Sequence, residues 1–534
     1  MHKTDTRRAL LIVFVLSALP YLAALGAGFV FDDAEAVVGN PLVNGEVGLS
    51  QLMERDFWGR SANVTIGSYR PLAVLTFIID STLGGGAPWL FHATNILLHS
   101  LCCVMLFVYL ADRFGHRLAI VSTSLFCVHA VHTENIAAIV ARADVLATLL
   151  LLLTLHVARA QTWHRWLVGP CFLLALLSKE IAVAGLAVVL ADAVLGLDSK
   201  ASRRWLVLSL AMMAAAFVAY LGMRYAALDM ITAPAKAQGN PLVDAGTSER
   251  LLTCATLLWR SIELFLVPLS QQADYSYPAI LPVDSIGPSV MLGAALWISL
   301  PATILIARKR APAAAWGAAV LLAAYVPVSN VFTLSPAIFA ERLLYLPSVG
   351  FVVAAGCAGL AALRVLPKQE SVLKLLFIVV LCTHALLSAF RTPDWKSDRT
   401  LFQADVMAGN PSMLAHLQLG FAYRSEGRFD DARLQYERAI VLAPAYADPY
   451  TGVGITLDLL GDPENAHKAL RRALELAPNC LDCSIALGTF YVKYGRFAGA
   501  ERELSRLQSL PGGSGYASML QEQLTAARQQ HSER

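Results

Sequence analysis

Two adjacent aspartates, Asp32 and Asp33, follow an apolar stretch that begins near Leu10. Two further pairs of opposite charge stand at the ends of apolar stretches: Lys179-Glu180 and Glu341-Arg342. A carboxylate can act as general base on a hydroxyl, and arginine and lysine can bind a phosphate. A sugar carried on a lipid phosphate needs both kinds of group, because its phosphate sits at the membrane interface while its acceptor arrives from water.

The composition indicates which elements must position these residues. The chain has 534 residues, of which 56% are hydrophobic and 15% charged, and its mean hydropathy is +0.55. Apolar runs of about 17–25 residues, long enough to cross a bilayer, recur up to Phe390 and stop after Arg391. We therefore predict a polytopic membrane domain over residues 1–391. The net charge of +3 and the lack of a basic, aromatic-rich patch give no sign of a nucleic-acid partner.

Lysine and arginine gather in six short loops, which the positive-inside rule places in the cytoplasm. They lie near residues 7–8, 113–117, 159–165, 200–204, 308–310 and 364–374. They separate about eleven predicted spans: 9–30, 92–111, 117–135, 140–158, 166–180, 182–197, 205–223, 289–307, 312–330, 343–363 and 373–390. The first is interpreted as an uncleaved helix and not as a signal peptide. The N-terminus is then cytoplasmic, and the C-terminal part lies outside.

A further apolar stretch, residues 251–269, contains Arg260 and Glu263, which are costly at a bilayer centre. A crossing there would also break the parity of spans between neighbouring cytoplasmic loops. We predict a re-entrant or interfacial helix on the outer face. The two aspartates also face outward, in the long segment 31–91, and long loops in compact proteins are usually functional.

The C-terminal part repeats with a period of 34 residues. Small residues recur at that spacing: Gly420, Gly454, Gly488, Ala432, Ala466 and Ala500. This period is the signature of tetratricopeptide repeats, whose concave surface binds extended peptides or partner helices. We predict a linker over 392–411, three repeats over 412–511, and a capping helix and tail over 512–534.

Cysteine and histidine give little indication of a metal. Cys480 and Cys483 form the only C-x-x-C, and one such pair is weak evidence for zinc. Two ordinary helix positions or a disulfide in an oxidising compartment are the alternatives. His129, His132 and Glu134 would permit a metal by spacing, but hydrogen-bonded residues lining a turn are the favoured interpretation. No cofactor is predicted, and a divalent metal is not indicated.

Several segments carry a family resemblance through their order and spacing: FVFDDAEAVVGNPLV, YRPLAVLTF, FHATNILLHS, VHAVHTENIAAIVARADVLA, LLSKE, LSQQADYSY and ERLLYLPSVG. They resemble the GT-C superfamily of membrane glycosyltransferases. The chain is most similar to the multi-span proteins with lumenal tetratricopeptide repeats that act as protein O-mannosyltransferases in the endoplasmic reticulum of animals. The resemblance covers most of residues 28–350 and continues into the repeats.

The resemblance implies that Asp32 or Asp33 is the base that takes the proton of the acceptor. It implies four candidate ligands for the donor phosphate, the last two of second rank: Arg342, Lys179, Arg70 and Arg142. Glu341 and Glu180 would orient the first two, and the remaining supporting residues are Glu134 and Tyr345. The family donor is a polyprenyl-phosphate sugar, typically mannose, and the acceptor is often a serine or threonine hydroxyl.

We therefore expect an all-α protein with a GT-C-like helix bundle and a repeat solenoid. It would be an inverting glycosyltransferase of the bacterial inner membrane, in contact with membrane lipid. Its repeats would lie in the periplasm and recruit a protein or peptide acceptor. Two alternatives remain. One is a non-catalytic membrane scaffold that docks partners through the repeats, and the other is an enzyme of the same fold that glycosylates a lipid or a glycan.

Overall fold

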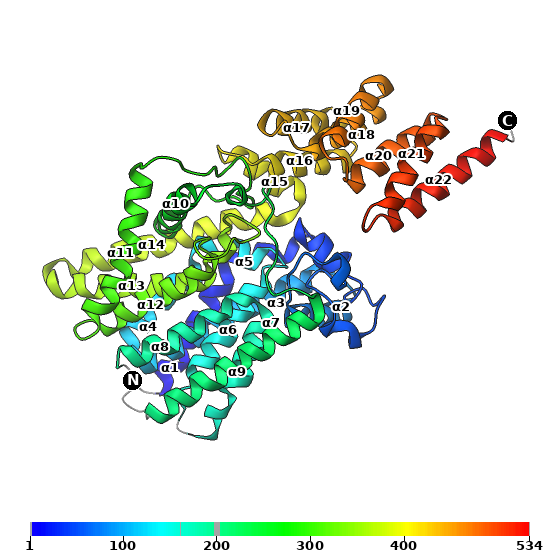
Figure 1. Ribbon diagram of the computed structural model, residues 1–534. Helices are drawn as coiled ribbons and strands as arrows, with labels where there is room; N and C mark the ends of the chain where they lie inside the picture. Colours follow the sequence, from blue (N-terminus) through cyan, green and yellow to red (C-terminus); the bar gives the residue numbers. More distant parts are fainter. Residues whose placement is uncertain (1–2, 161, 197–202, 533–534) are drawn as a thin grey trace. The chain divides into compact units, whose positions relative to one another are not determined.

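The computed structural model describes residues 3–160, 162–196 and 203–532 (Figure 1). These residues contain many helices and no β-strand. The chain divides into two compact units, the first formed by Met1–Ala273 with Leu281–Thr400 and the second by Asp274–Ile280 with Leu401–Arg534. The predicted all-α class, with apolar helices followed by a helical solenoid, is confirmed.

Within the described residues of the first unit, six helical segments are long and apolar enough to cross a membrane. They are Arg7–Gly26 (in α1, Lys3–Ala18, and the following 3₁₀ helix), Pro88–Phe114 (α3), Arg204–Leu228 (in α9, Arg203–Leu228), Pro288–Ala307 (α11), Glu341–Val365 (ending in α13, Tyr345–Val365) and Pro367–Lys396 (containing α14, Glu370–Arg391). One bent pair would make a seventh. Each of the six coincides with a predicted span.

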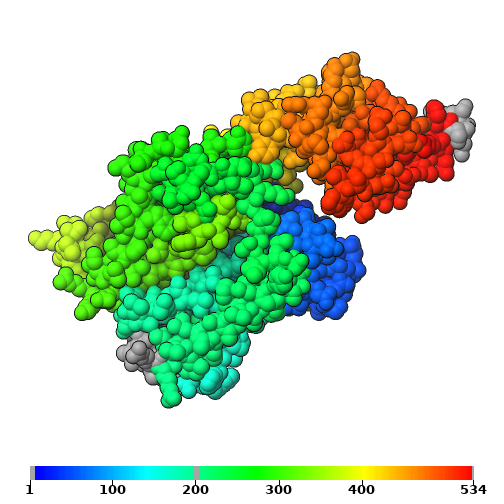
Figure 2. All heavy atoms as spheres, in the orientation of Figure 1, coloured from blue at the N-terminus to red at the C-terminus, as the bar shows by residue number. Residues whose placement is uncertain are grey.

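The other five predicted spans coincide with shorter helices, of 11 to 16 residues. These are α4 (His116–Val128), α6 (Arg142–Val157), α7 (Val168–Ser178), α8 (Ala184–Val194) and α12 (Pro312–Tyr325). A perpendicular crossing needs about 20 residues, so the count of about eleven crossings stays a prediction. Side chains fill the spaces between the helices of this unit on the face that Figure 2 shows.

The stretch predicted to be a re-entrant or interfacial helix forms α10 (Thr247–Leu266), and its placement at the membrane surface stays a prediction. Its apolar residues recur every three to four positions, and the face they form packs against α11. Gly293 of α11 permits this approach, because a Cβ atom there would overlap the backbone of Ala255. Glu263 is exposed on the other side of α10, as an interfacial helix would require.

The two ends of α3 and α6 make different sets of contacts. At its end, α3 forms a 2.6 Å ion pair from Arg113 to Asp192 of α8, and the carbonyl that follows α6 accepts a hydrogen bond from Trp205 of α9. Two of the residues predicted to face outward lie instead at the first turn of α6: Arg142 belongs to this turn, and Lys179 pairs with its Asp144. The predicted topology requires this grouping, although part of the loop at 200–204 lies outside the described residues.

A bent element of the chain positions the residues that were predicted to face outward. The short helix α5 (Thr133–Ala137) belongs to a segment that meets α6 at 108°. Asp33 bridges the bend, since its Oδ1 accepts a 2.9 Å hydrogen bond from the backbone of Val140. We call residues 133–144 the bent element.

Arg142 locks the bent element into the first unit. Its side chain is fully buried and pairs with Asp80 of α2 (Pro71–Gly84) at 2.6 Å. Its remaining N–H groups donate to Asn95, to Thr76 and to the carbonyl of Phe91 at 2.6 to 3.1 Å. Every guanidinium nitrogen is therefore engaged by the fold.

The second unit consists mainly of antiparallel helix pairs, drawn from yellow to red in Figure 1. After α15 (Asp398–Met407) the pairs are α16 (Met413–Ser425) with α17 (Phe429–Leu442), α18 (Ala447–Leu459) with α19 (Pro463–Leu476), and α20 (Leu481–Lys493) with α21 (Phe497–Ser509). The last helix is α22 (Ser514–Ser532). Gly420 faces the ring of Tyr436 and Gly454 faces the side chain of Leu470, where a Cβ would lie 2.4 Å and 2.6 Å from the nearest carbon atoms. The small residues of the period thus allow helices to cross closely.

One short segment from the middle of the chain belongs to the second unit. Within Asp274–Ile280, the backbone of Asp274 donates to Asp405 and the carbonyl of Tyr277 accepts from the backbone of Met413, at 3.0 and 3.1 Å. The ring of Tyr277 also stacks on Tyr446. We call this segment the strap.

We predict that Arg142→Met destabilises the protein by about 3–5 kcal/mol, because it leaves Asp80 charged and unpaired in the interior. The double variant Arg142→Met/Asp80→Leu should recover much of this loss, since both charges are then removed. Thermal unfolding in detergent, followed by tryptophan fluorescence, measures the difference. Lys374→Gln breaks the exposed pair with Glu370 and should change nothing measurable. Equal stability of the single and double variants would contradict the stabilising role of the Arg142–Asp80 ion pair.

Candidate functional site

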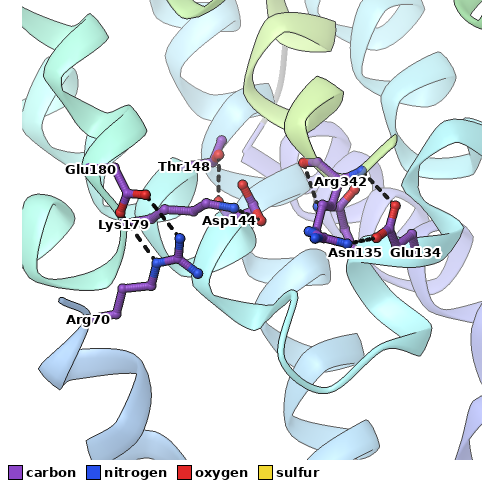
Figure 3. Close-up of polar contacts among 8 residues, drawn as sticks. All are labelled: Arg70, Glu134, Asn135, Asp144, Thr148, Lys179, Glu180 and Arg342. Atoms are coloured by element: carbon purple, nitrogen blue, oxygen red, sulfur yellow. Dashed lines mark hydrogen bonds and ion pairs between the residues drawn. The ribbon is translucent and has the colours of Figure 1, made fainter. Parts of the chain in front are cut away.

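Three of the predicted phosphate ligands come together from distant parts of the chain (Figure 3). Arg70 immediately precedes α2, Lys179 follows α7 in an extended conformation, and Arg342 lies in the 3₁₀ turn Glu341–Leu344 before α13. The charge of Lys179 interacts with those of the other two. We call these three residues the cation cluster.

Each member of the cation cluster is held by a carboxylate. Arg342 forms an ion pair with Glu134, which also accepts a 2.9 Å hydrogen bond from the backbone of Arg342. Lys179 pairs with Asp144 at 2.5 Å. Two of the three partners therefore come from the bent element, on either side of its bend. Both are buried, with side chains only 3% exposed, so the cations are held from the protein side.

Arg70 is held differently. Its guanidinium makes two hydrogen bonds to Glu180, at 3.0 and 3.3 Å, in the bidentate arrangement favoured by arginine and carboxylate. The Glu180 side chain is 47% exposed, and that of Arg70 is 16% exposed. Burial would lower the pKa of Arg70, but the charge of Glu180 raises it, so Arg70 stays cationic at neutral pH.

The predicted orienting pairs differ from those observed. Glu180 binds Arg70 and not its neighbour Lys179. Glu341 turns away from Arg342, and its two oxygens accept hydrogen bonds from the side chain of Gln271 and the backbone of Gln272, at 2.6 and 2.7 Å. Adjacent residues in extended or 3₁₀ backbone point in different directions. Sequence neighbours therefore cannot orient each other here.

The acid pair is split between two environments. Asp33 is fully buried, and its oxygens accept the backbone N–H groups of Val140 at 2.9 Å and Val30 at 3.2 Å. Burial raises the pKa of Asp33 to about 7, although these hydrogen bonds oppose the shift. Asp32 is half-buried, and its charge interacts with that of Arg342. Of the two acids, Asp32 is thus the more exposed, and its charge interacts with that of one member of the cation cluster.

The remaining predicted site residues have structural surroundings. Arg142 is locked as described above, which disfavours it as a phosphate ligand, whereas Arg342 keeps 25% of its side chain exposed. Tyr345 is fully buried, and its hydroxyl lies 2.7 Å from Nδ1 of His99. His132 contacts Ser348 at 2.8 Å. No group of three or more histidine, cysteine or acidic side chains in the described part of the chain is placed to hold a metal.

Three residues of this network were not predicted as site residues: Asp144, Asn135 and Asp80. Asn135 donates a 3.0 Å hydrogen bond to the carbonyl of Arg342 and so fixes the turn that carries it. Asp80 stands alone in the apolar helix α2. An isolated charge in an apolar stretch indicates a buried partner, and this signal was available in the sequence.

Comparison with known proteins finds matches to both units of the chain. Models of the tetratricopeptide repeat match residues 413–446 and 459–524. A protein O-mannosyl-transferase of Caenorhabditis elegans is 29% identical over 450 residues, covering 82% of this chain and 63% of the relative. Protein O-mannosyl-transferase TMTC4 of Mus musculus is 29% identical over 488 residues, covering 80% of this chain and 66% of the relative.

Protein O-mannosyl-transferase TMTC1 of Homo sapiens is also 29% identical, over 505 residues that cover 82% of this chain and 55% of the human protein. The matches thus span at most 66% of the length of these three relatives. They extend through the membrane helices into the repeats and confirm the expected resemblance. Over about four fifths of its length, the chain is similar to proteins named protein O-mannosyl-transferase, and its C-terminal part matches models of the tetratricopeptide repeat.

Proposed function

We propose that this protein transfers a sugar from a polyprenyl phosphate to a serine or threonine hydroxyl of a protein. The proposed sugar is mannose, as the names of its relatives suggest. The reaction takes place on the extracytoplasmic face of a bacterial inner membrane. One observation carries this proposal. Three cations, each held by a carboxylate, gather beside an acid pair at one end of a bundle of apolar helices.

The cation cluster suits a phosphate that becomes more negative during reaction. As the bond from the anomeric carbon to the phosphate oxygen breaks, the phosphodiester becomes a monoester and gains charge. Positive groups that are oriented beforehand stabilise such charge without reorganising. Arg342 and Lys179 are oriented by the bent element through Glu134 and Asp144, and Arg70 can approach the same phosphate from the long outer loop.

Asp32 is the proposed base, and Asp33 is a positioning residue. Asp32 would take the proton of the acceptor hydroxyl while the hydroxyl oxygen attacks the anomeric carbon from the side opposite the phosphate. This single displacement inverts the configuration at that carbon. Asp33 cannot easily serve as base, because both its oxygens accept backbone N–H groups in the interior. It instead ties the Asp32 backbone to the bent element, which carries the partners of Arg342 and Lys179.

The repeats are proposed to present the protein acceptor, since stacked repeats bind extended peptides on their concave side. Their location outside the cytoplasm is supported by a disulfide between Cys480 and Cys483, because disulfides persist in oxidising compartments. A scaffold without catalytic function would not need the cation cluster. A lipid or glycan acceptor remains the second candidate within the same fold.

We predict that Asp32→Asn lowers sugar transfer by about 10²- to 10⁴-fold, the usual effect of losing a general base. Binding of a polyprenyl-phosphate donor should persist, because the cation cluster is intact. Transfer from polyprenyl-phosphate mannose to a serine- and threonine-containing peptide measures the first effect, and donor protection against thermal unfolding measures the second. Undiminished transfer by the purified variant would refute the assignment.

We predict that activity falls as the pH drops below about 7, while stability does not. Protonation of Asp33, with its pKa near 7, removes an acceptor from one of its two N–H groups and loosens the bent element. Because this pKa is higher in the folded than in the unfolded state, protonation itself favours folding. Parallel pH profiles of transfer rate and thermal unfolding test the prediction. In Asp33→Asn, transfer should be lower by about tenfold and lose this pH limb, and persistence of the limb would contradict its origin in Asp33.

We predict that labelled sugar from the donor appears on protein and not on lipid. Purified protein is incubated with labelled polyprenyl-phosphate mannose and a detergent extract of bacterial membranes, and the products are separated into protein and lipid fractions. Label released from protein by β-elimination is expected. Label confined to the lipid fraction would favour the lipid or glycan alternative, and absence of label from both fractions would favour the scaffold. The Asp32→Asn protein is the matched control.

A further inference from the structure

The C-x-x-C of the second unit has no part in the proposed sugar transfer. Cys480 and Cys483 are joined by a disulfide at the start of α20. Cys480 occupies the N-cap position, and its sulfur accepts a 3.0 Å hydrogen bond from the backbone N–H of Cys483. Two cysteines thus lie within the first turn of a helix, where the unpaired N–H groups and the helix dipole favour negative charge.

The repeat architecture does not require cysteine at these positions. The period of 34 residues places Ser412 and Tyr446 in register with Cys480. In the first repeat the Ser412 hydroxyl caps α16 by accepting the backbone N–H of Ala415 at 2.9 Å, so an ordinary cap suffices. A disulfide that closes so short a loop also constrains the unfolded chain least. Neither capping nor stability therefore accounts for the pair.

The two cysteines differ in exposure. Cys480 is half-buried and lies between the exposed residues Asn479 and Asp482, whereas Cys483 is fully buried. The hydroxyl of Thr451, on the preceding α18, lies 3.5 Å from the Cys483 sulfur. A thiolate arriving from solvent can therefore attack only Cys480. The departing Cys483 thiolate would remain next to the Thr451 hydroxyl and the start of α20, both of which stabilise it.

We propose that this pair is a thiol–disulfide exchange site for polypeptides that carry a cysteine. The client thiolate attacks the Cys480 sulfur, a bond forms between the two sulfurs, and Cys480–Cys483 breaks with its electron pair on Cys483. The mixed disulfide is then resolved in one of two ways. In the first, the Cys483 thiolate attacks the Cys480 sulfur, re-forms the original disulfide and releases the client thiol. In the second, another client thiolate attacks the client sulfur, Cys480 leaves as a thiolate, and the two clients are joined by a disulfide, so that two electrons and two protons have passed to the cysteine pair. The proposal stands independently of sugar transfer.

The test uses the full-length protein in detergent. Trypsin releases residues 473–493, which contain Cys480 and Cys483 and no other cysteine, so mass spectrometry follows this pair without interference from the membrane cysteines. The native protein is equilibrated with mixtures of reduced and oxidised glutathione, alkylated and digested. The oxidised fraction of this peptide is expected to fall in one two-electron transition within the range of the buffer. A peptide that stays fully oxidised or fully reduced throughout would overturn the proposal.

Two matched variants test the assigned roles. Cys483→Ser should form a stable mixed disulfide at Cys480 with oxidised glutathione, about tenfold faster than Cys480→Ser forms one at the buried Cys483. Circular dichroism checks that both variants are folded. If one of them is not, the glutathione titration of the wild-type protein still tests the proposal. In the native protein, a one-cysteine peptide long enough to lie along the repeats should reduce the pair faster than the much shorter glutathione does, because stacked repeats bind extended peptides. Equal adduct rates in the two variants, or equal rates for peptide and glutathione, would overturn the assignment.

Discussion

The structure of the first unit depends on how charge is tolerated at the end of an apolar helix bundle. Burying an isolated ionised side chain in a medium of low polarity costs free energy. A buried ion pair is tolerated only when its geometry is good and its remaining hydrogen-bonding groups have partners. The bent element meets this requirement in three places, through Glu134, Arg142 and Asp144. Its own position is fixed by the Asp33 carboxylate. The same residues that neutralise buried charge in the fold therefore also orient the groups proposed to bind the donor.

This arrangement separates two roles among the cations. Arg142 uses every nitrogen on partners within the fold, so it contributes rigidity. Arg342 and Arg70 each have a carboxylate on one side and remain partly exposed on the other. A side chain anchored at one end and open at the other loses little conformational freedom when a ligand binds. Preorganisation of this kind is what electrostatic stabilisation of a leaving phosphate requires.

The sequence supported some of these conclusions and not others, for physical reasons. The 34-residue period predicts the helix pairs of the repeats, because register within a stack is local information. The cation cluster was named in advance from the resemblance, and Glu180 and Glu134 were named as supporting residues, but which cation each carboxylate pairs with was not predicted. The contact between Glu134 and Arg342 joins residues 208 positions apart, and no periodicity reports such a pairing. Helix lengths were overestimated where polar residues such as Lys179 interrupt an apolar run, since hydropathy averages over the break.

The strap gives the chain an unusual order of assembly. A ribosome completes Asp274–Ile280 well before residues 405–413, which supply its hydrogen-bonding partners in the second unit. During synthesis this short stretch must therefore wait for these partners while four further apolar helices are inserted. The first helices of the solenoid can reach their final packing only by recruiting a segment made earlier. Maturation of the solenoid is thus tied to insertion of the helices that separate the strap from it, and a nascent protein stalled before residue 405 would display Tyr277 without its stacking partner.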